Sequence, residues 1–163
     1  MVAGSARPGR YNDIRKDFAT LQEMGIEIIV NLCETRLEMP PEFAACFREI
    51  HEPILDGHPP EPEQLERIIA DVSQAARCGK RAVIHCRGGV GRTATVLIPL
   101  IMAMEGLPLE EAVQKLRVAG RYTQTMQQWH FLEAWVRNFE APKTATPPRK
   151  KPRASSLRKK DQK

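Results

Sequence analysis

A glycine-rich stretch follows an apolar run in residues 83–96, VIHCRGGVGRTATV. Glycines allow the tight turns in which successive backbone N–H groups point inward and bind an anion. The apolar run before the glycines predicts a strand, and the run after them predicts a helix whose N-terminus adds the positive end of its dipole. We therefore expect this loop to cradle a tetrahedral oxyanion such as phosphate. The predicted phosphate-binding residues are Arg87, Gly88, Gly89, Val90, Gly91 and Arg92.

Three side chains of the same stretch carry the chemistry that such a cradle serves. The positive surroundings of Cys86 are expected to ionise its thiol near neutral pH and make it a nucleophile. Arg92 can hold two phosphate oxygens and stays charged, and Thr93 can donate its hydroxyl to the sulfur. The stretch thus predicts transfer of a phosphoryl group to Cys86. An incidental buried cysteine is the alternative, but the full pattern H-C-x-x-G-x-x-R-[ST] is far more specific than a glycine loop.

The elements around this loop alternate between strands and helices. The apolar spacing predicts helices over residues 12–24, 40–49, 63–78, 93–105, 109–119 and from 125 onward. Short β-branched runs predict buried strands over residues 26–32, 49–54 and 81–85. This alternation indicates an α/β fold, a mainly parallel sheet flanked by helices in a single compact domain. Ligands of such sheets bind at the carboxyl ends of the strands, which is where the cysteine loop begins.

The positive charge of the chain is concentrated near its C-terminal end. The 163 residues include 25 Lys and Arg against 20 Asp and Glu, a formal net charge of +5. Residues 141–163 hold nine of those bases and a single acid, Asp161, with few apolar side chains. We predict a folded domain over residues 1–140 and a disordered basic tail over 141–163. Such a tail is suited to contact acidic partners or nucleic acid, and its PPRKKPR run is typical of a nuclear-import signal.

The remaining composition narrows the class of protein. The four cysteines lack the spacing of a metal site, and the sequence shows no other cluster of metal-ligating residues, so we expect neither a metal nor a cofactor. The sequence shows no signal peptide, and no apolar run has the length of a membrane span. We predict a monomeric protein without a membrane span, located in the cytoplasm, with the basic tail adding a nuclear destination.

The motif formed by His85, Cys86, Gly89, Arg92 and Thr93 resembles that of the cysteine-dependent protein phosphatases, and within them the small dual-specificity group. The resemblance covers the predicted domain and leaves the tail unmatched. It implies a protein tyrosine phosphatase-like fold. It also implies that His85 orients the loop through hydrogen bonds rather than transferring protons.

Two further segments carry this resemblance. HEPILDG, residues 51–57, is similar to the general-acid loop of the family in its kinase-associated phosphatase form, which implies that Asp56 protonates the leaving group. QTMQQWHFLEAW, residues 124–135, is similar to the family's glutamine segment, which implies that Gln124 and Gln128 position a water. The residues alone also allow simpler interpretations, because Asp-Gly is common in turns and Thr125 with Gln128 fits a helix capping box.

The resemblance implies phosphoprotein substrates carrying phosphotyrosine and phosphoserine or phosphothreonine. Phosphoinositide phosphatases of the superfamily have basic residues at the first and fourth loop positions, which here are Arg87 and Val90. Alternatives are therefore a phosphoinositide or RNA 5′-phosphate phosphatase, a sulfur-transfer domain and a non-catalytic phosphate-binding adaptor.

Cys33, in VNLCETR, follows a predicted strand that we expect beside the strand leading to Cys86. Both cysteines would then lie at the same edge of the sheet. The segment is also similar to one in the phosphoinositide branch, where a cysteine forms a reversible disulfide with the nucleophile, which implies a redox partner at Cys33. A small buried hydrophobe is the alternative interpretation, and Cys46 and Cys78 are the other candidate partners.

Overall fold

The computed structural model describes residues 1–138, so the predicted tail over 141–163 lies outside the described residues. A four-stranded sheet forms its centre, with strands β1 (Val2–Ala6), β2 (Ile26–Asn31), β3 (Arg48–His51) and β4 (Arg81–Cys86). The strand order is β1-β4-β2-β3, and each neighbouring pair is parallel. The predicted fold class, a mainly parallel sheet flanked by helices in one domain, is confirmed.

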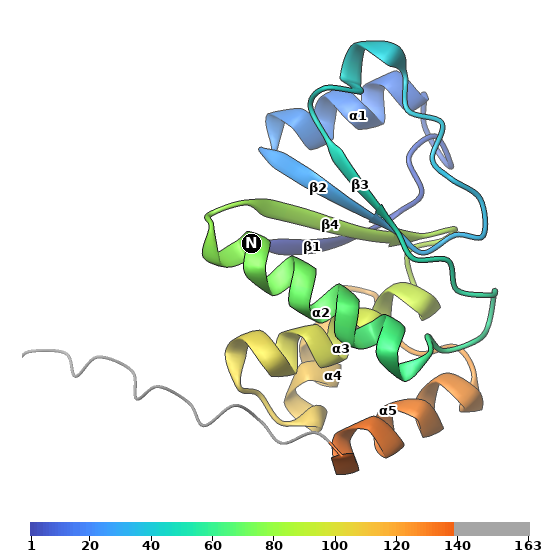
Figure 1. Ribbon diagram of the computed structural model, residues 1–163. Coiled ribbons are helices and arrows are strands. Elements are labelled where there is room, and N and C mark those ends of the chain that lie inside the picture. The colour runs from blue at the N-terminus through green and yellow to red at the C-terminus, as the bar shows by residue number, and fades with distance from the viewer. Residues whose placement is uncertain (139–163) are drawn as a thin grey trace, which may run out of the picture.

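Helices cover both faces of this sheet (Figure 1). Helix α1 (Ile14–Glu23) and the short 3₁₀ helix η1 (Pro41–Phe43) lie on one face. The other face carries helices α2 (Pro62–Arg77), α3 (Gly91–Glu105), α4 (Leu109–Val118) and α5 (Met126–Asn138). No helix in residues 1–138 combines the length and the apolar character that crossing a membrane requires.

The alternation of side chains along the strands divides the core into two clusters. Ile29 and Val83 pack with Phe18 of α1 on one face. Val30 and Ile84, their neighbours along the strands, belong to the larger cluster under the four helices. Because β2 and β4 are covered on both faces, they consist largely of apolar residues.

Helix α3 runs through the middle of the larger cluster. Its residues from Gly91 to Leu100 are all buried, and Pro99 lies within the helix. The helix is therefore enclosed by its neighbours, and its first turn, which carries Arg92 and Thr93, is fixed directly behind the cysteine loop. The predicted helices over 12–24, 63–78, 93–105, 109–119 and from 125 onward correspond to α1, α2, α3, α4 and α5.

One prediction about local structure is wrong, and one strand was missed. A helix was expected over residues 40–49, but only Pro41–Phe43 form a 3₁₀ turn, and strand β3 already begins at Arg48. The strand β1 was not predicted, because its residues, VAGSA, are small and mostly weak strand formers. Its pairing with β4 provides the order that its sequence does not indicate.

Candidate active site

The carboxyl ends of the parallel strands converge on the cysteine loop. Ala6 lies beside Cys86 in the register of β1 and β4, and Asn31 lies beside His85 in that of β2 and β4. Residues 87–90 form the loop between the end of β4 and the start of α3. The segments after β2 and β3 and the start of α5 supply the remaining side chains.

The three glycines of the loop differ in backbone conformation and in the space around them. Gly89 has a positive φ of 73°, and a Cβ added to it would lie 2.5 Å from the backbone of Ser5 and Ala6. Gly91 has an ordinary φ, but its Cβ would collide with the amide of Gln124. A Cβ on Gly88 would meet nothing within 4 Å. The turn therefore depends on Gly89, and close packing depends on both Gly89 and Gly91.

Cys86 is buried, and its thiol has a pKa below the ordinary value. Burial opposes ionisation, but the Thr93 hydroxyl, the backbone N–H groups of Thr93 and Gly89 and the charge of Arg92 together outweigh it. The Thr93 hydroxyl is close enough to act on the sulfur, yet it stops short of full hydrogen-bond geometry and has no other partner in residues 1–138. The surroundings of the thiol favour the thiolate.

Arg92 is held from behind by a set of acceptors. Its Nη1 donates to the Ile54 carbonyl at 2.7 Å and to Glu34 Oε2 at 2.8 Å, with the Leu32 carbonyl at 3.5 Å. Its Nη2 forms an ion pair with Asp56 Oδ1 at 3.0 Å. The side chain is 2% exposed, and Nε has no hydrogen-bond partner in the described part of the chain. The guanidinium is thus fixed in place with donors to spare for a ligand.

Asp56 and Glu34 form an acidic pair across this guanidinium. The Asp56 carboxylate is 68% exposed, and its loop turns at Gly57 with a φ of 76°. The Asp56 backbone N–H donates to Glu34 Oε1 at 3.0 Å, so one glutamate contacts both the acid loop and Arg92. Burial tends to raise the pKa of Glu34, but its hydrogen bonds, that from Arg92 foremost, bring it below the ordinary value.

Sequence reasoning missed Glu34. The available signal was its position, an acidic side chain just beyond the end of a strand whose neighbour carries the nucleophile. Nothing in the sequence indicated which other strand end it would face.

The two predicted glutamines, Gln124 and Gln128, differ in burial and in their hydrogen-bond partners. The Gln124 side chain is exposed and accepts a hydrogen bond from the Gly91 backbone at 3.1 Å, directly at the loop. Gln128 is fully buried; its Oε1 accepts from the Gln124 backbone at 2.8 Å, and its Nε2 donates to the His58 carbonyl at 3.4 Å. Since these contacts occupy the Gln128 amide in the interior, the expectation that Gln128 itself positions a water does not fit the structure.

The same segment joins the acid loop to helix α5. The Thr125 hydroxyl accepts from the Gln128 backbone at 3.2 Å and donates to the Gly57 carbonyl at 2.8 Å. The expected capping box is therefore half formed, because the Gln128 side chain binds the Gln124 backbone instead of that of Thr125.

His85 is buried, and burial lowers the pKa of its imidazole to about 4. Neither ring nitrogen has a hydrogen-bond partner in residues 1–138. The Cys86 backbone is close enough to the ring to raise the imidazole pKa, which works against the effect of burial, but it stops short of full hydrogen-bond geometry. That His85 orients the loop through its ring therefore stays a prediction. The residue contributes through its backbone, whose carbonyl accepts from the Leu32 N–H at 2.9 Å.

Cys33 lies in the segment after β2, with its backbone N–H bound to Asn31 Oδ1 at 2.9 Å and its carbonyl 2.9 Å from His51 Nε2. The thiol is buried, and burial raises its pKa above the ordinary value. Cys33 and Cys86 are both free, and their charges affect each other.

The other two cysteines are placed differently. Cys46 precedes β3 and Cys78 precedes β4, whereas Cys86 ends β4. In a parallel sheet this sets Cys46 and Cys78 near the amino ends of the strands. Cys33, which follows β2, shares the carboxyl edge with the nucleophile. Residues 1–138 contain no group of three or more His, Cys, Asp or Glu side chains placed to hold a metal ion.

Comparison with known proteins agrees with this arrangement. The family model described as "Polymorphic toxin system, DSP-PTPase phosphatase" matches residues 3–105. Cyclin-dependent kinase inhibitor 3 of Mus musculus is 27% identical over 143 residues, covering 78% of this chain and 67% of that protein. Protein tyrosine phosphatase type IVA 3 of Homo sapiens is 29% identical over 118 residues, covering 71% of this chain and 67% of that protein.

Solved structures show the same likeness. Tk-PTP in its active form has a TM-score of 0.74 at 27% identity, covering 85% of this chain and 92% of that chain. Kinase associated phosphatase shares the fold, with a TM-score of 0.68 at 24% identity and coverage of 83% of each chain. The chain belongs to the dual-specificity phosphatase family of the protein tyrosine phosphatases, resembles its kinase-associated phosphatase branch, and is a protein phosphatase.

Proposed function

We propose that Cys86 carries the reaction as a phosphocysteine. Its sulfur attacks the phosphorus of a phosphomonoester, the bond from phosphorus to the leaving oxygen breaks, and Asp56 gives that oxygen a proton. Asp56 then accepts a proton from water, the water oxygen attacks phosphorus, and the sulfur–phosphorus bond breaks to release inorganic phosphate and thiolate. The observation that supports this most is the lowered pKa of the Cys86 thiol beside a fixed Arg92.

The backbone of residues 87–92 and the free donors of Arg92 bind the phosphate in this proposal. The incoming dianion competes with Asp56 for Nη2 of Arg92, where the carboxylate lies at 3.0 Å. Once displaced, Asp56 lies free above the phosphate, in the position that a general acid needs. Thr93 stabilises the sulfur as it leaves phosphorus.

Glu34, Gln124 and Gln128 act on these groups from around the site. Glu34 links the acid loop to Arg92 through one carboxylate. Gln128 links the His58 carbonyl to the backbone of Gln124. We assign Glu34 and Gln128 as positioning residues and keep Gln124, whose exposed side chain lies at the loop, as the candidate for orienting the water.

The proposed substrates are phosphotyrosine and phosphoserine or phosphothreonine in proteins. Val90 at the fourth loop position gives no second positive charge for a multiply phosphorylated lipid, although Arg87 is exposed at the first. From the sequence, we also propose a monomer whose catalytic domain spans residues 1–140. Its tail over 141–163 would contact acidic partners or nucleic acid and direct part of the cytoplasmic protein to the nucleus.

Turnover of para-nitrophenyl phosphate and of a phosphotyrosine peptide tests the mechanism. Cys86→Ser should abolish both activities and retain bound phosphopeptide, while Cys78→Ser, which removes a thiol at the other end of β4, should leave both unchanged. Activity should persist with EDTA and be lost with vanadate. Loss on chelation that a divalent ion restores would contradict the thiolate mechanism. Faster turnover of phosphoinositides or RNA 5′-phosphates than of phosphopeptides would overturn the substrate class.

A second experiment tests the positioning role of Glu34. Glu34→Gln keeps the size of the side chain but has one acceptor oxygen for two donors, Arg92 and the Asp56 backbone. We expect kcat/KM to fall by about tenfold, most for poor leaving groups, because the acid loop is less well placed. An equal loss for good and poor leaving groups would remove the link to Asp56.

A further inference from the structure

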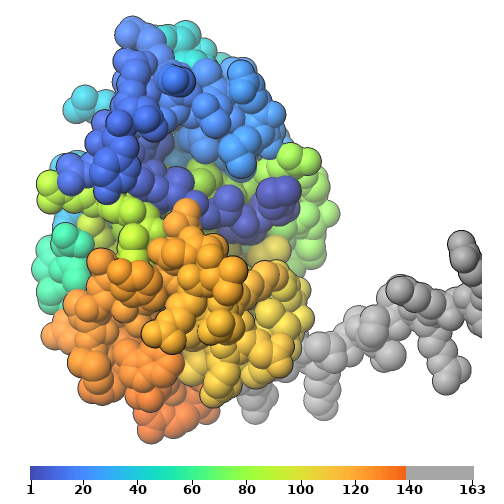
Figure 2. Space-filling model, turned by 180° about the vertical axis from the view of Figure 1, so that it is seen from behind, coloured from blue at the N-terminus to red at the C-terminus, as the bar shows by residue number. Residues whose placement is uncertain are grey.

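Strand β1 forms the outer edge of the sheet, and its residues are all partly exposed. Helix α1 packs over β2 and β4, where Phe18 contacts Phe43 and Phe47 with ring centroids 5.6 Å apart in each pair. This placement leaves β1 beside the helix rather than under it. Figure 2 shows β1 at the surface, in dark blue, between the lighter blue segment that includes α1 and the yellow and orange segments of α4 and α5.

A groove of about 290 Å³ lies between β1 and α1. Its walls include Ala3 and Ser5 of β1, Thr20 and Leu21 of α1, Met24 and Tyr11. We call it the edge groove. The five residues of β1 extend over about 16 Å at the usual rise of a strand, so the groove runs beside β1 for a distance that about five residues of an extended peptide would span.

The edge groove ends at the catalytic loop. Its lining continues from Ala3 to Arg7, and the Arg7 backbone N–H donates to the Arg87 carbonyl at 3.3 Å. Gly89 packs against the backbone of Ser5 and Ala6. Strand β1, which lines the groove, lies next to β4, which ends in Cys86. A peptide whose phosphorylated residue lies over Cys86 therefore has the groove within reach of its flanking residues.

The charges that line the groove are already paired. Arg7 donates to the Arg36 carbonyl at 2.7 Å and to the carbonyl and hydroxyl of Thr35 at 3.2 and 3.0 Å. Asp17 accepts from the Gly9 N–H at 2.9 Å and from Asn12 at 3.1 Å. What remains for a ligand is mainly apolar surface, together with the Ser5 hydroxyl, which is buried and unpartnered in residues 1–138.

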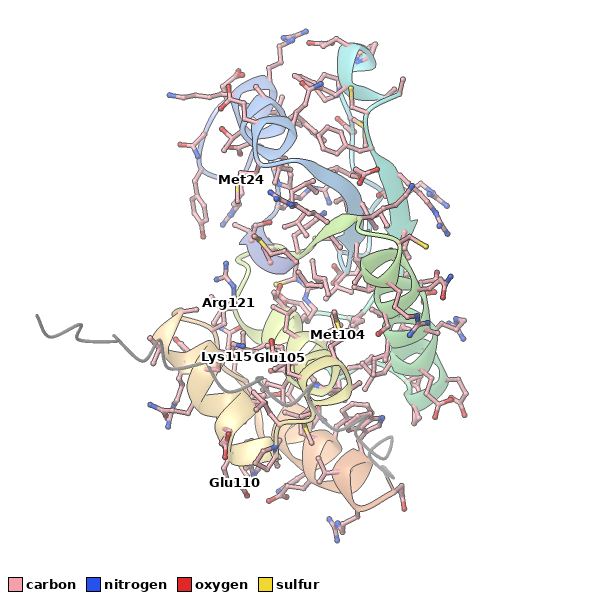
Figure 3. The ribbon with its side chains drawn as sticks, turned by 90° about the vertical axis from the view of Figure 1, so that its left-hand side faces the viewer. Met24, Met104, Glu105, Glu110, Lys115 and Arg121 are labelled. Atoms are coloured by element: carbon pink, nitrogen blue, oxygen red, sulfur yellow. The ribbon has the colours of Figure 1, made fainter. Side chains whose placement is uncertain are left out.

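The edge of β1 does not offer a place for another strand. Arg121 approaches from the opposite face and donates to the Gly4 carbonyl. A Cβ on Gly4 would lie 2.5 Å from Arg121 Nε, so the two groups are in close contact. Figure 3 shows Met24 on the α1 side of the sheet, with Arg121, Lys115, Glu105 and Met104 on the other. A charged side chain over an edge strand prevents pairing along it, so the groove is suited to side chains rather than to an added strand.

Met24 and Tyr11 are exposed at opposite ends of the groove, at 46% and 71%. Methionine and tyrosine are enriched where proteins bind other proteins. A second copy of the chain would bring only the small side chains of β1 to this place if the two edges met. Residues 139–163 hold only two large apolar side chains, Phe139 and Leu157, among small, polar and charged ones. A second copy and the tail therefore supply few of the large apolar groups that the groove fits.

We propose that the edge groove binds the part of the phosphoprotein substrate that flanks the phosphorylated residue, and that it selects a large apolar side chain there. This proposal rests on the proposed function. It makes the enzyme selective for phosphorylation sites with Leu, Met or Phe nearby.

The test compares pairs of phosphotyrosine peptides that differ only in carrying Leu or Ser at one position within four residues on either side. At the best position, wild-type kcat/KM should be about tenfold higher for Leu, as expected for burial of one apolar side chain. Thr20→Trp fills the groove and Met24→Asp adds a charge to it. Both should abolish the preference and leave turnover of para-nitrophenyl phosphate unchanged. Glu23→Trp, exposed on the same helix but outside the groove, is the matched control and should keep the preference.

The outcomes separate this proposal from the proposed function. Equal kcat/KM for Leu and Ser at all positions in the wild type, or a preference that survives both groove variants, would overturn the groove proposal while catalysis stands. If Cys86→Ser loses turnover of para-nitrophenyl phosphate, the catalytic proposal stands. If the wild type is then found to be a dimer and Thr20→Trp a monomer, the groove is a surface for self-association and not for substrate. Absence of any phosphatase activity in the wild type would reject the proposed function itself.

Discussion

Replacing Arg92 tests how the guanidinium divides its donors between the protein and the phosphate. The side chain has five N–H donors. Ile54 and Glu34 occupy Nη1. Nε has no partner in residues 1–138, and Nη2 becomes available when the phosphate displaces Asp56, so the substrate receives one hydrogen bond from each of these two nitrogens. A hydrogen bond to a charged group contributes about 1.5–3 kcal/mol. Two of them amount to roughly 3–6 kcal/mol, or about 10²–10⁴ in kcat/KM.

Arg92→Ala should therefore lose about 10²–10⁴ in kcat/KM. Arg92→Lys keeps the charge and one directed donor, and should lose only about 10–10². Since Glu34 and Asp56 are 47% and 68% exposed, water can replace the guanidinium around both carboxylates. The free energy of unfolding should fall by about 1 kcal/mol, which lowers Tm by about 2–4 °C.

The assay is steady-state turnover of para-nitrophenyl phosphate and of a phosphotyrosine peptide, with Tm measured for each variant. Equal losses for Arg92→Lys and Arg92→Ala would show that the directed pair of donors is unimportant. Losses below threefold in proteins of normal Tm would refute the assignment of Arg92 to phosphate binding.

Four further expectations concern the acid, the nucleophile, the second thiol and the tail. Asp56→Asn should lower kcat by about 10²–10⁴, most for alkyl phosphates; a uniform loss across a leaving-group series would make Asp56 structural. Thr93→Ala removes a group that lowers the pKa of Cys86, so the acid limb of kcat/KM should move to higher pH, and an unmoved limb would exclude that effect. In Cys33→Ser, dithiothreitol should no longer restore the activity that peroxide removes. A peptide map that pairs Cys86 with another thiol would reject Cys33 as its partner. Deletion of residues 142–163 should leave small-substrate turnover within about twofold, and a large fall in Tm would move the domain boundary.

The parts of the site that could be predicted from the residues are those that lie close together in the chain. Cys86, Arg92 and Thr93 belong to one strand, loop and helix start, so their spacing alone indicates the cradle. Asp56 and Gln124 come from distant segments, and only the resemblance to a family suggested them. Neither the spacing of residues nor the family resemblance indicated Glu34, because its contact with Arg92 depends on how the segment after β2 meets the start of α3.

Local pattern also failed where tertiary contacts decide the structure. Residues 40–49 open with two prolines, which favoured a short helix there; the segment also contains Phe43 and Phe47. In the structure both rings pack around Phe18 of α1, and the chain extends from Arg48 to pair with β2. The Gln128 position was likewise ambiguous in sequence, since a capping residue and a site residue look the same until the partner of the amide is known.

The strand order has a consequence for how the enzyme is made. Because β1 pairs with β4 and not with β2, the first strand of the chain has no neighbour until the strand that ends in Cys86 has been synthesised. Contacts between segments so far apart in sequence close late and slow folding, and a nascent chain exposes its unpaired strands meanwhile. The loop needs the backbone of Ser5 and Ala6 to hold Gly89 in place. Phosphatase activity should therefore appear only after β1 has paired with β4, so that a chain in which this pairing has not yet formed has no phosphatase activity.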